Sequence, residues 1–266
     1  MFDSFKPKKH LVVLLGFFMF YAVLAQRQKL FIYEHFIYQG DTLNYRMLLP
    51  KHFDSTKKYP LMLFLHGAGE RGNDNEKQLV HGSSLFTKGK NRRKFPAIVI
   101  FPQCPQNDYW ANVTVDRSVH PYIFEFHSDE EPTKSLNLVM HLMDDMTAKP
   151  FIDKHRIYVG GLSMGGMGTF EILYRKPEMF AAAFAICGAG TPKTVEKYAV
   201  NTPLWVFHGA KDDIVNPQFS LSMVSAYLKA GGRPNYNLYA DDNHNSWDDA
   251  FAEPKLLPWL FSKSKH

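Results

Sequence analysis

The sequence has little of what several other kinds of protein depend on. Only two cysteines occur among its 266 residues, which excludes a fold held together by a dense disulfide framework. It also contains no internal repeat, no low-complexity stretch and no linker that would divide it. After residues 1–25, about 240 residues remain, and this length suits one α/β domain with a sizeable core. We therefore expect a single domain over residues 26–266.

Long apolar runs are scarce as well, and the clear example lies at the N-terminus. Three lysines precede a mostly apolar run over residues 11–24, and Val23 and Ala25 supply small side chains before Gln26. This order is typical of a secretory signal peptide, and the run is short for a membrane span. The pattern predicts a signal over residues 1–25, a secreted or periplasmic protein, and no stable membrane insertion after cleavage. An uncleaved N-terminal anchor is the alternative.

A strong excess of charge of one sign is missing too. The formal net charge is +5, and it falls to +3 when the three lysines and one aspartate of residues 1–25 are left out. So mild a balance does not predict a nucleic-acid partner. The one basic cluster, Lys88–Lys94, lies between two expected strands. It is interpreted as a solvated loop, with an anion or polysaccharide contact as the alternative. The histidines show no metal-ligand spacing, so neither a metal nor another cofactor is expected.

What the sequence does contain is an alternation of short apolar runs with helix-like segments. Strands are expected at residues 31–38, 43–49, 61–65, 97–101, 156–160, 182–186, 204–208 and 236–239. Helices are expected at residues 132–147, 167–174, 195–198, 218–230 and 247–261. The first two strands form an antiparallel hairpin around Gln39-Gly40-Asp41, and the later ones are apolar throughout, as in a covered parallel sheet. This predicts the α/β class, with an eight-stranded, mostly parallel sheet covered by helices on both faces.

The pattern centres on the stretch Gly161-Leu-Ser-Met-Gly165. An apolar run leads into it, and a helix-like stretch follows until Pro177. Strand, G-x-S-x-G and helix together indicate a sharp, strained turn that exposes a nucleophilic serine hydroxyl beside a helix N-terminus. Small residues at both ends of the pentapeptide let the strand and helix backbones approach each other. Ser163 is the candidate nucleophile; a glycine-rich turn without chemistry is the alternative for the pentapeptide alone.

A serine needs a base within hydrogen-bond reach, and the base needs an acid to orient it. His244 follows the last expected strand, in a loop from which its side chain can reach over the sheet to Ser163. Asp212 and Asp213 follow the strand that ends at His208. We expect Asp212 to orient His244 and Asp213 to be solvated or capping.

Acyl transfer also needs two backbone N–H groups aimed at the developing oxyanion. Met164, directly after the serine, supplies one candidate. The loop His66-Gly-Ala-Gly-Glu-Arg-Gly72 supplies the other, and its three glycines let the backbone approach a substrate closely. We expect the N–H of Ala68 to serve, with Gly67 as the alternative donor and a substrate contact. His66 is expected to pack and to form hydrogen bonds beneath the loop.

These stretches together resemble the α/β-hydrolase superfamily. Within it, the chain is similar to secreted bacterial esterases related to feruloyl and acetyl-xylan esterases of the polyhydroxybutyrate-depolymerase type, often labelled prolyl-oligopeptidase-like. The residues that carry the resemblance are 66–72, 102–105 with Trp110, 161–166, 207–212 and 244–247. The resemblance implies the sheet order 1-2-4-3-5-6-7-8 and the chain order nucleophile, acid, base. Only about 35 residues lie between residue 25 and the third strand, which disfavours a peptidase with a substrate-screening propeller.

The implied sheet order bears on the two cysteines. Cys104 and Cys187 follow strands that are three positions apart, or about 14 Å at roughly 4.8 Å per strand. A disulfide spans Cα atoms no more than about 7 Å apart. We therefore predict two free and mostly buried thiols.

Two tryptophans are expected to wall a substrate cleft. Trp110 follows the fourth strand, and Trp247 follows His244 by three residues, although either could be a packing aromatic instead. The sequence thus predicts a secreted serine carboxylesterase that acts through an acyl-enzyme, on substrates such as acetyl or feruloyl esters of plant or algal polysaccharide. The alternatives are a serine peptidase for small peptides and a catalytically silent carbohydrate-binding module. The sequence carries no signal for an oligomeric state.

Overall fold

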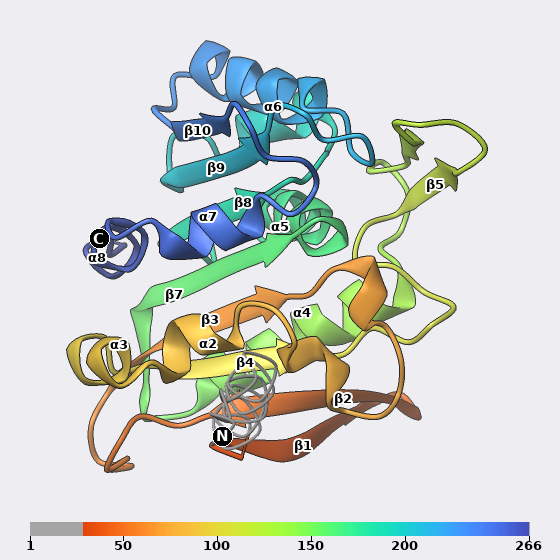
Figure 1. Cartoon of the computed structure of the whole chain (residues 1–266). Coiled ribbons are helices and arrows are strands. Elements are labelled where there is room, and N and C mark those ends of the chain that lie inside the picture. Colours follow the sequence, from red (N-terminus) through yellow and green to blue (C-terminus); the bar gives the residue numbers. More distant parts are fainter. Residues whose placement is uncertain (1–28, 266) are drawn as a thin grey trace, which may run out of the picture.

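The computed structural model describes residues 29–265, so the signal predicted over residues 1–25 lies outside the described part of the chain (Figure 1). The main-sheet strands are β1 Phe31–Tyr38, β2 Asp41–Leu48, β3 Tyr59–Leu65, β4 Ile98–Pro102, β7 Ile152–Leu162, β8 Ala182–Ile186, β9 Leu204–Gly209 and β10 Asn235–Tyr239. They form one 8-stranded sheet in the order β1-β2-β4-β3-β7-β8-β9-β10. β2 is antiparallel to β1 and to β4, and the other neighbours are parallel. The predicted fold class and strand order are confirmed.

Helices cover both faces of this sheet (Figure 1). One face carries α4 Lys134–Ala148, α5 Met164–Arg175, η3 Pro192–Lys197 and α6 Gln218–Lys229, and the other carries α2 Ser83–Thr87, α3 Gly89–Lys94, α7 Trp247–Ala252 and α8 Leu256–Phe261. Alternate residues of β3 divide between the two cores, as the period of two in a strand requires. Leu61, Leu63 and Leu65 pack on the α4 side, whereas Met62 and Phe64 pack on the α8 side.

The turn between β1 and β2 follows the expected chemistry. Gln39 and Gly40 have φ values of 51° and 86°, which suits a two-residue hairpin turn whose central residues both have positive φ. Strand pairing runs from Tyr38 opposite Asp41 to Phe31 opposite Leu48.

Two helical expectations need correction. The helix expected over residues 247–261 is two short helices, α7 and α8, because Pro254 lacks an N–H and disfavours helical geometry in the residue before it. The basic cluster Lys88–Lys94 is not a loop, since α3 occupies most of it. Asn91 helps to hold α3 in place by donating from Nδ2 to the Leu85 carbonyl at 2.8 Å. No side chain of α3 is buried, so the expectation that this segment is solvated is confirmed.

A second, two-stranded sheet was not predicted. β5 (Val113–Asp116) and β6 (Ile123–Phe126) form an antiparallel hairpin that stands away from the main sheet (Figure 1). The Tyr122 N–H donates to the Ile214 carbonyl at 2.9 Å, and Phe124 packs in a small apolar cluster with α5 and the segment after β9. The hairpin therefore lies beside the carboxyl ends of the parallel strands. Open α/β sheets generally bind their ligands at this edge.

Both cysteines are free and buried, as predicted. Among residues 29–265, no helix is long and apolar enough to cross a membrane.

Candidate active site

Ser163 lies in the sharp turn between β7 and α5. Its φ of 54° and ψ of −119° are rare for a residue with a side chain, and neighbouring hydrogen bonds hold this strained geometry. The Ser163 N–H donates to the Ile186 carbonyl at 2.8 Å, and its own carbonyl accepts from the Met167 N–H at 3.0 Å. The flanking glycines are needed, because a Cβ on Gly165 would lie 1.9 Å from the carbonyl oxygen of Leu65. The predicted turn is thus present, with the serine at its tip.

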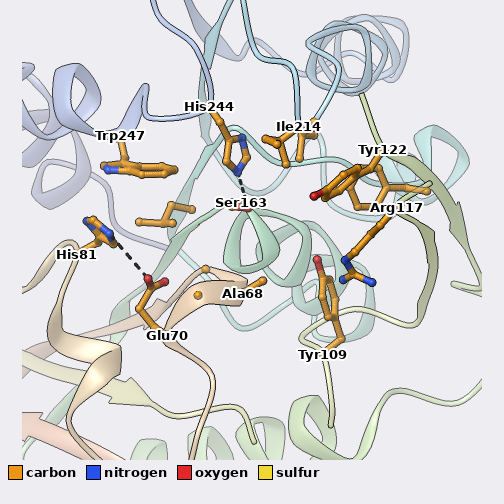
Figure 2. A pocket seen from close by; sticks show the side chains of 15 residues that line it. Ala68, Glu70, His81, Tyr109, Arg117, Tyr122, Ser163, Ile214, His244 and Trp247 are labelled. Atoms are coloured by element: carbon orange, nitrogen blue, oxygen red, sulfur yellow. Dashed lines mark hydrogen bonds and ion pairs between the residues drawn. The ribbon is translucent and has the colours of Figure 1, made fainter. Parts of the chain in front are cut away.

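Three predicted residues from distant parts of the chain meet at this turn, and Figure 2 shows two of them, Ser163 and His244. His244, in the loop after β10, has its Nε2 2.9 Å from Ser163 Oγ. Its Nδ1 lies 2.8 Å from Oδ2 of Asp212, in the loop after β9. Asp213 is exposed and its backbone N–H donates to Asn243, so Asp212 is the carboxylate that faces the histidine. The arrangement can carry a proton from the serine to an oriented imidazole.

Asp212 is buried and fully hydrogen-bonded. Its Oδ1 accepts from the backbone N–H groups of Ile214 and Val215 at 3.0 and 2.9 Å. Its Oδ2 accepts from His244 and also from His208 Nε2, at 3.1 Å. Burial alone would raise the pKa of Asp212, but the hydrogen bonds from both histidines outweigh burial and hold that pKa well below its usual range. Asp212 therefore stays ionised as a rigid acceptor.

His208 is a residue of this site that the sequence reasoning did not find. It is fully buried at the end of β9, with Nδ1 2.6 Å from Ser220 Oγ and Nε2 2.9 Å from the Val215 carbonyl. Since Nε2 faces two acceptors, it carries a proton and donates to Oδ2 of Asp212, the same oxygen that His244 contacts. Its position four residues before Asp212, across a glycine turn, is the signal in the sequence that could have indicated this contact.

The candidate oxyanion donors lie on both sides of Ser163. Met164 begins α5, so its N–H is one of those that a helix leaves without an intrahelical acceptor. Gly67 and Ala68 line the cleft together with Ser163, and the backbone of Gly67 comes close enough that an added Cβ would lie 3.7 Å from Ser163 Cβ. This places a second strip of backbone beside the nucleophile.

The loop that carries Gly67 and Ala68 is braced from below. His66 is fully buried, and its Nδ1 donates to the Gly67 carbonyl at 2.7 Å while its Nε2 accepts from the Cys104 N–H at 3.0 Å. Burial lowers the pKa of His66 to about 4, so the ring is neutral, as this pair of contacts requires. The packing role predicted for His66 is confirmed. Arg71 Nε donates to the Ala68 carbonyl at 3.0 Å and adds a second brace.

A cleft of about 330 Å³ opens over Ser163 (Figure 2). Gly67 and Trp247 line it, as predicted. Trp110 does not, and that expectation is corrected: its indole is fully buried, and Nε1 donates to the His66 carbonyl at 3.1 Å. The close approach of α5 explains this position, since a Cβ on Gly168 would lie 2.4 Å from Trp110 Cβ.

The two ends of the cleft differ in chemistry. At one end, Glu70 pairs with His81, with Oε1 and Nε2 3.8 Å apart, and Trp247 packs 5.1 Å from the His81 ring. Burial raises the pKa of Glu70, and His81 opposes that shift. The other end is formed by Tyr109 and by residues of the β5–β6 hairpin and its turn, which the sequence reasoning missed: Arg117, Tyr122 and Phe124.

Among residues 29–265, one group of side chains brings several atoms of metal-ligand type close together. Cys187, Asp212 and His244 each offer a ligand atom, and these atoms lie within 4.8 Å of one another. The two ring nitrogens of His244 already face Asp212 and Ser163, so a metal bound to either nitrogen would replace one of these two contacts. The geometry fits proton transfer better than metal binding.

Residues 54–255 match the family model described as phospholipase/carboxylesterase. The chain belongs to this family. It is 33% identical to a thermostable esterase of known structure, with a TM-score of 0.82, over 90% of this chain and 64% of that one. It is also 33% identical over 101 residues to the bifunctional acetylxylan esterase/xylanase of Neocallimastix patriciarum, covering 38% of this chain and 14% of that protein.

A ferulic acid esterase from Anaeromyces mucronatus shares the fold of this carboxylesterase-family chain at 16% identity. Its TM-score is 0.64, and 88% of this chain and 90% of that one are covered. The chain spans less than two thirds of the length of the thermostable esterase and a small part of the bifunctional enzyme. The family assignment confirms the predicted resemblance to the esterases of the α/β-hydrolase superfamily.

Proposed function

We propose that the chain is an exported serine carboxylesterase whose nucleophile is Ser163. The observation that carries this proposal is the hydrogen-bonded series from Ser163 Oγ through His244 to Asp212, with distances of 2.9 and 2.8 Å. Its members come from three separate loops at one edge of the sheet, so a chance alignment of all three is improbable on geometric grounds. The family to which the chain belongs supports the reading.

The first half of the reaction forms an acyl-enzyme. Ser163 Oγ bonds to the ester carbonyl carbon while its proton passes to Nε2 of His244. The carbon–oxygen bond to the alcohol then breaks, and the alcohol leaves with the proton held on Nε2. Asp212 keeps the imidazole oriented throughout and stabilises it while it is positively charged.

The second half releases the acid. Water gives a proton to Nε2 of His244 and bonds to the acyl carbon, and the proton returns to Ser163 Oγ as the acyl group departs. In both halves the carbonyl oxygen becomes negative, and the N–H groups of Met164 and Ala68 donate to it, with Gly67 as the alternative donor. Each such donor contributes about 3–4 kcal/mol to stabilising the transition state.

The substrate that this proposal favours is an acetyl or feruloyl ester on a polysaccharide. The acetylxylan esterase relative and the ferulic acid esterase of similar fold support that choice. Trp247 and Gly67 contact the substrate in this account, and Trp110 does not. Residues 1–25 contain a basic start, then an apolar run, then small residues, and this order supports export. The proposed catalytic domain is the single domain over residues 26–266.

The test compares ester and amide substrates. Wild-type protein is expected to release p-nitrophenol from p-nitrophenyl acetate or butyrate and to leave peptide p-nitroanilides intact. Ser163→Ala should lower ester turnover by about 10⁴-fold or more with little change in thermal unfolding. Ser222→Ala, on the exposed side of α6, is the matched control and should retain full activity. Ester turnover by Ser163→Ala equal to that of the wild type would overturn the proposal. Efficient cleavage of the p-nitroanilides by the wild-type protein would favour the alternative, a serine peptidase for small peptides.

A further inference from the structure

One end of the cleft carries a cation for which the described residues provide no acidic partner. Arg117, in the turn between β5 and β6, lines the cleft, and no carboxylate of residues 29–265 lies within ion-pair distance of its guanidinium. Its contact is with the Tyr122 ring, 5.9 Å from Cζ to the centroid. Figure 2 shows the side chain running from the hairpin toward Tyr109, with the guanidinium at the edge of the cleft.

The acidic residues nearest to Arg117 and Tyr109 in sequence are engaged elsewhere. Asp116 accepts from the Ser118 N–H at 2.8 Å. Asp108 accepts from the N–H and the hydroxyl of Ser135 at 2.8 and 2.6 Å. The positive charge at this end of the cleft is therefore not neutralised by these neighbours.

A second guanidinium strengthens the positive charge there. Arg71 lies 5.7 Å from the Tyr109 ring centroid, and its N–H groups donate to neutral carbonyls of Ala68, Gln106 and Asp108. Both arginines act electrostatically on Tyr109, where they oppose the rise in its pKa that burial causes. Two cations thus lie near Tyr109: Arg71 contacts its ring, and Arg117 acts on it electrostatically.

Arg117 and Tyr109 also stand at a junction between two hollows. Both residues line the cleft over Ser163, and both line a more open hollow of about 340 Å³ beyond it. That second hollow is polar, with Asn107, Asn112 and Thr133 among its residues. A substrate that extends from the serine into the second hollow must pass the Arg117 guanidinium.

We infer that the substrate is an ester whose acyl or alcohol part carries an anionic group, such as a carboxylate, bound by Arg117 beside Tyr109. At the opposite end of the cleft Glu70 lies 3.8 Å from His81, so that end offers an anion no cation without an acidic neighbour. Charge therefore sets the direction in which the substrate lies. This inference rests on the proposed esterase function and narrows its substrate class.

The experiment uses two pairs of esters that match in size and differ in charge. On the alcohol side, 4-carboxyphenyl acetate is compared with 4-carbamoylphenyl acetate, and on the acyl side, monoethyl adipate is compared with ethyl adipamate. We expect the wild-type protein to prefer the anionic ester of at least one pair by about two- to fivefold in kcat/KM, mainly through KM. The pair that shows the preference identifies the part of the substrate that Arg117 binds. Because Arg117 is exposed, raising the salt concentration should weaken the preference.

Three variants distinguish charge recognition from other effects. Arg117→Gln should bring the ratio between charged and neutral esters to about one, whereas Arg117→Lys should retain most of it. Arg93→Gln, on the exposed α3 helix, removes the same charge far from the cleft lining and should leave the ratio as in the wild type. Equal use of both esters in both pairs, or a preference that survives Arg117→Gln, would overturn the inference while leaving the esterase proposal standing. No turnover of the four esters by protein that hydrolyses p-nitrophenyl acetate would overturn the inference alone. No turnover of p-nitrophenyl acetate either would overturn the proposed function, and the inference with it.

Discussion

Asp212 and Asp213 are adjacent in sequence but differ in their surroundings, so they form a matched pair for mutation. Asp212 is buried against His244, and Asp213 is exposed. Asp212→Asn and Asp213→Asn each remove one negative charge, and any general effect of net charge is therefore equal in the two variants. If Asp212 orients the catalytic histidine, only Asp212→Asn should lose activity.

The size of that loss follows from the hydrogen bonds. Two backbone N–H groups hold Oδ1 of Asp212, so in Asp212→Asn the amide nitrogen would replace Oδ2 and face His244. His244 Nδ1 would then have to accept a hydrogen bond, and its proton would move to Nε2. A protonated Nε2 cannot take the proton of Ser163. The equivalent change in a serine protease lowers kcat about 10⁴-fold, or about 5.4 kcal/mol.

The assay is kcat/KM for p-nitrophenyl acetate, with urea unfolding as a check on the fold. Asp212→Asn should lose about 10⁴-fold in kcat/KM and about 2–4 kcal/mol of stability, since charge-assisted hydrogen bonds from His208 and His244 are lost. Asp213→Asn should stay within a fewfold of wild type in activity and within about 0.5 kcal/mol in stability. Activity in Asp212→Asn within tenfold of wild type would refute the reasoning, and so would a larger loss in Asp213→Asn.

Stability as a function of pH gives a second readout on Asp212. Its pKa is held well below the usual range because the hydrogen bonds outweigh the effect of burial. A carboxyl group with a depressed pKa stabilises the fold above the pKa of the unfolded chain, about 3.9, and this contribution is lost as pH falls below that value. The difference in unfolding free energy between wild type and Asp212→Asn should therefore shrink below about pH 4. A difference that grows in acid would contradict this account.

Three further predictions concern the elements around the site. Gly165→Ala should prevent stable folding, because a Cβ there meets the Leu65 carbonyl oxygen at 1.9 Å, whereas Gly69→Ala should be tolerated, since nothing lies within 4 Å; soluble yield and melting temperature test both. Trp247→Ala should raise KM for esters, while Trp110→Phe should mainly lower stability, by about 1 kcal/mol for the lost hydrogen bond. A raised KM in Trp110→Phe with an unchanged KM in Trp247→Ala would indicate instead that Trp110 lines the cleft. Both cysteines should resist Ellman's reagent in the folded protein and react after denaturation, and rapid labelling of folded protein would contradict their burial.

The sequence was most informative where local chemistry decides the structure. The close strand–helix turn requires glycine at positions 161 and 165, so the position of Ser163 could be predicted from the pentapeptide and the elements that flank it. His244 and Asp212 each follow a strand whose carboxyl end lies at the same edge of the sheet, and the strand order was implied by the resemblance to a known family.

Features that depend on packing between distant segments could not be predicted in this way. The β5–β6 hairpin has strands of only four residues each, and its placement depends on the Tyr122–Ile214 hydrogen bond. The direction of the Trp110 side chain depends on the space left by Gly168 in α5, which no local pattern in the sequence indicates. For the same reason the residues at the positively charged end of the cleft, Arg117 above all, could be identified only from the structure.

The most direct test of the central claim is labelling of the purified protein with a fluorophosphonate probe, analysed by intact mass and peptide mapping. The account predicts a single adduct on Ser163, which should be lost in Ser163→Ala and strongly reduced in His244→Ala. Folded wild-type protein that takes up no probe, or an adduct on another serine, would contradict an activated Ser163 and would favour a binding module on a hydrolase fold.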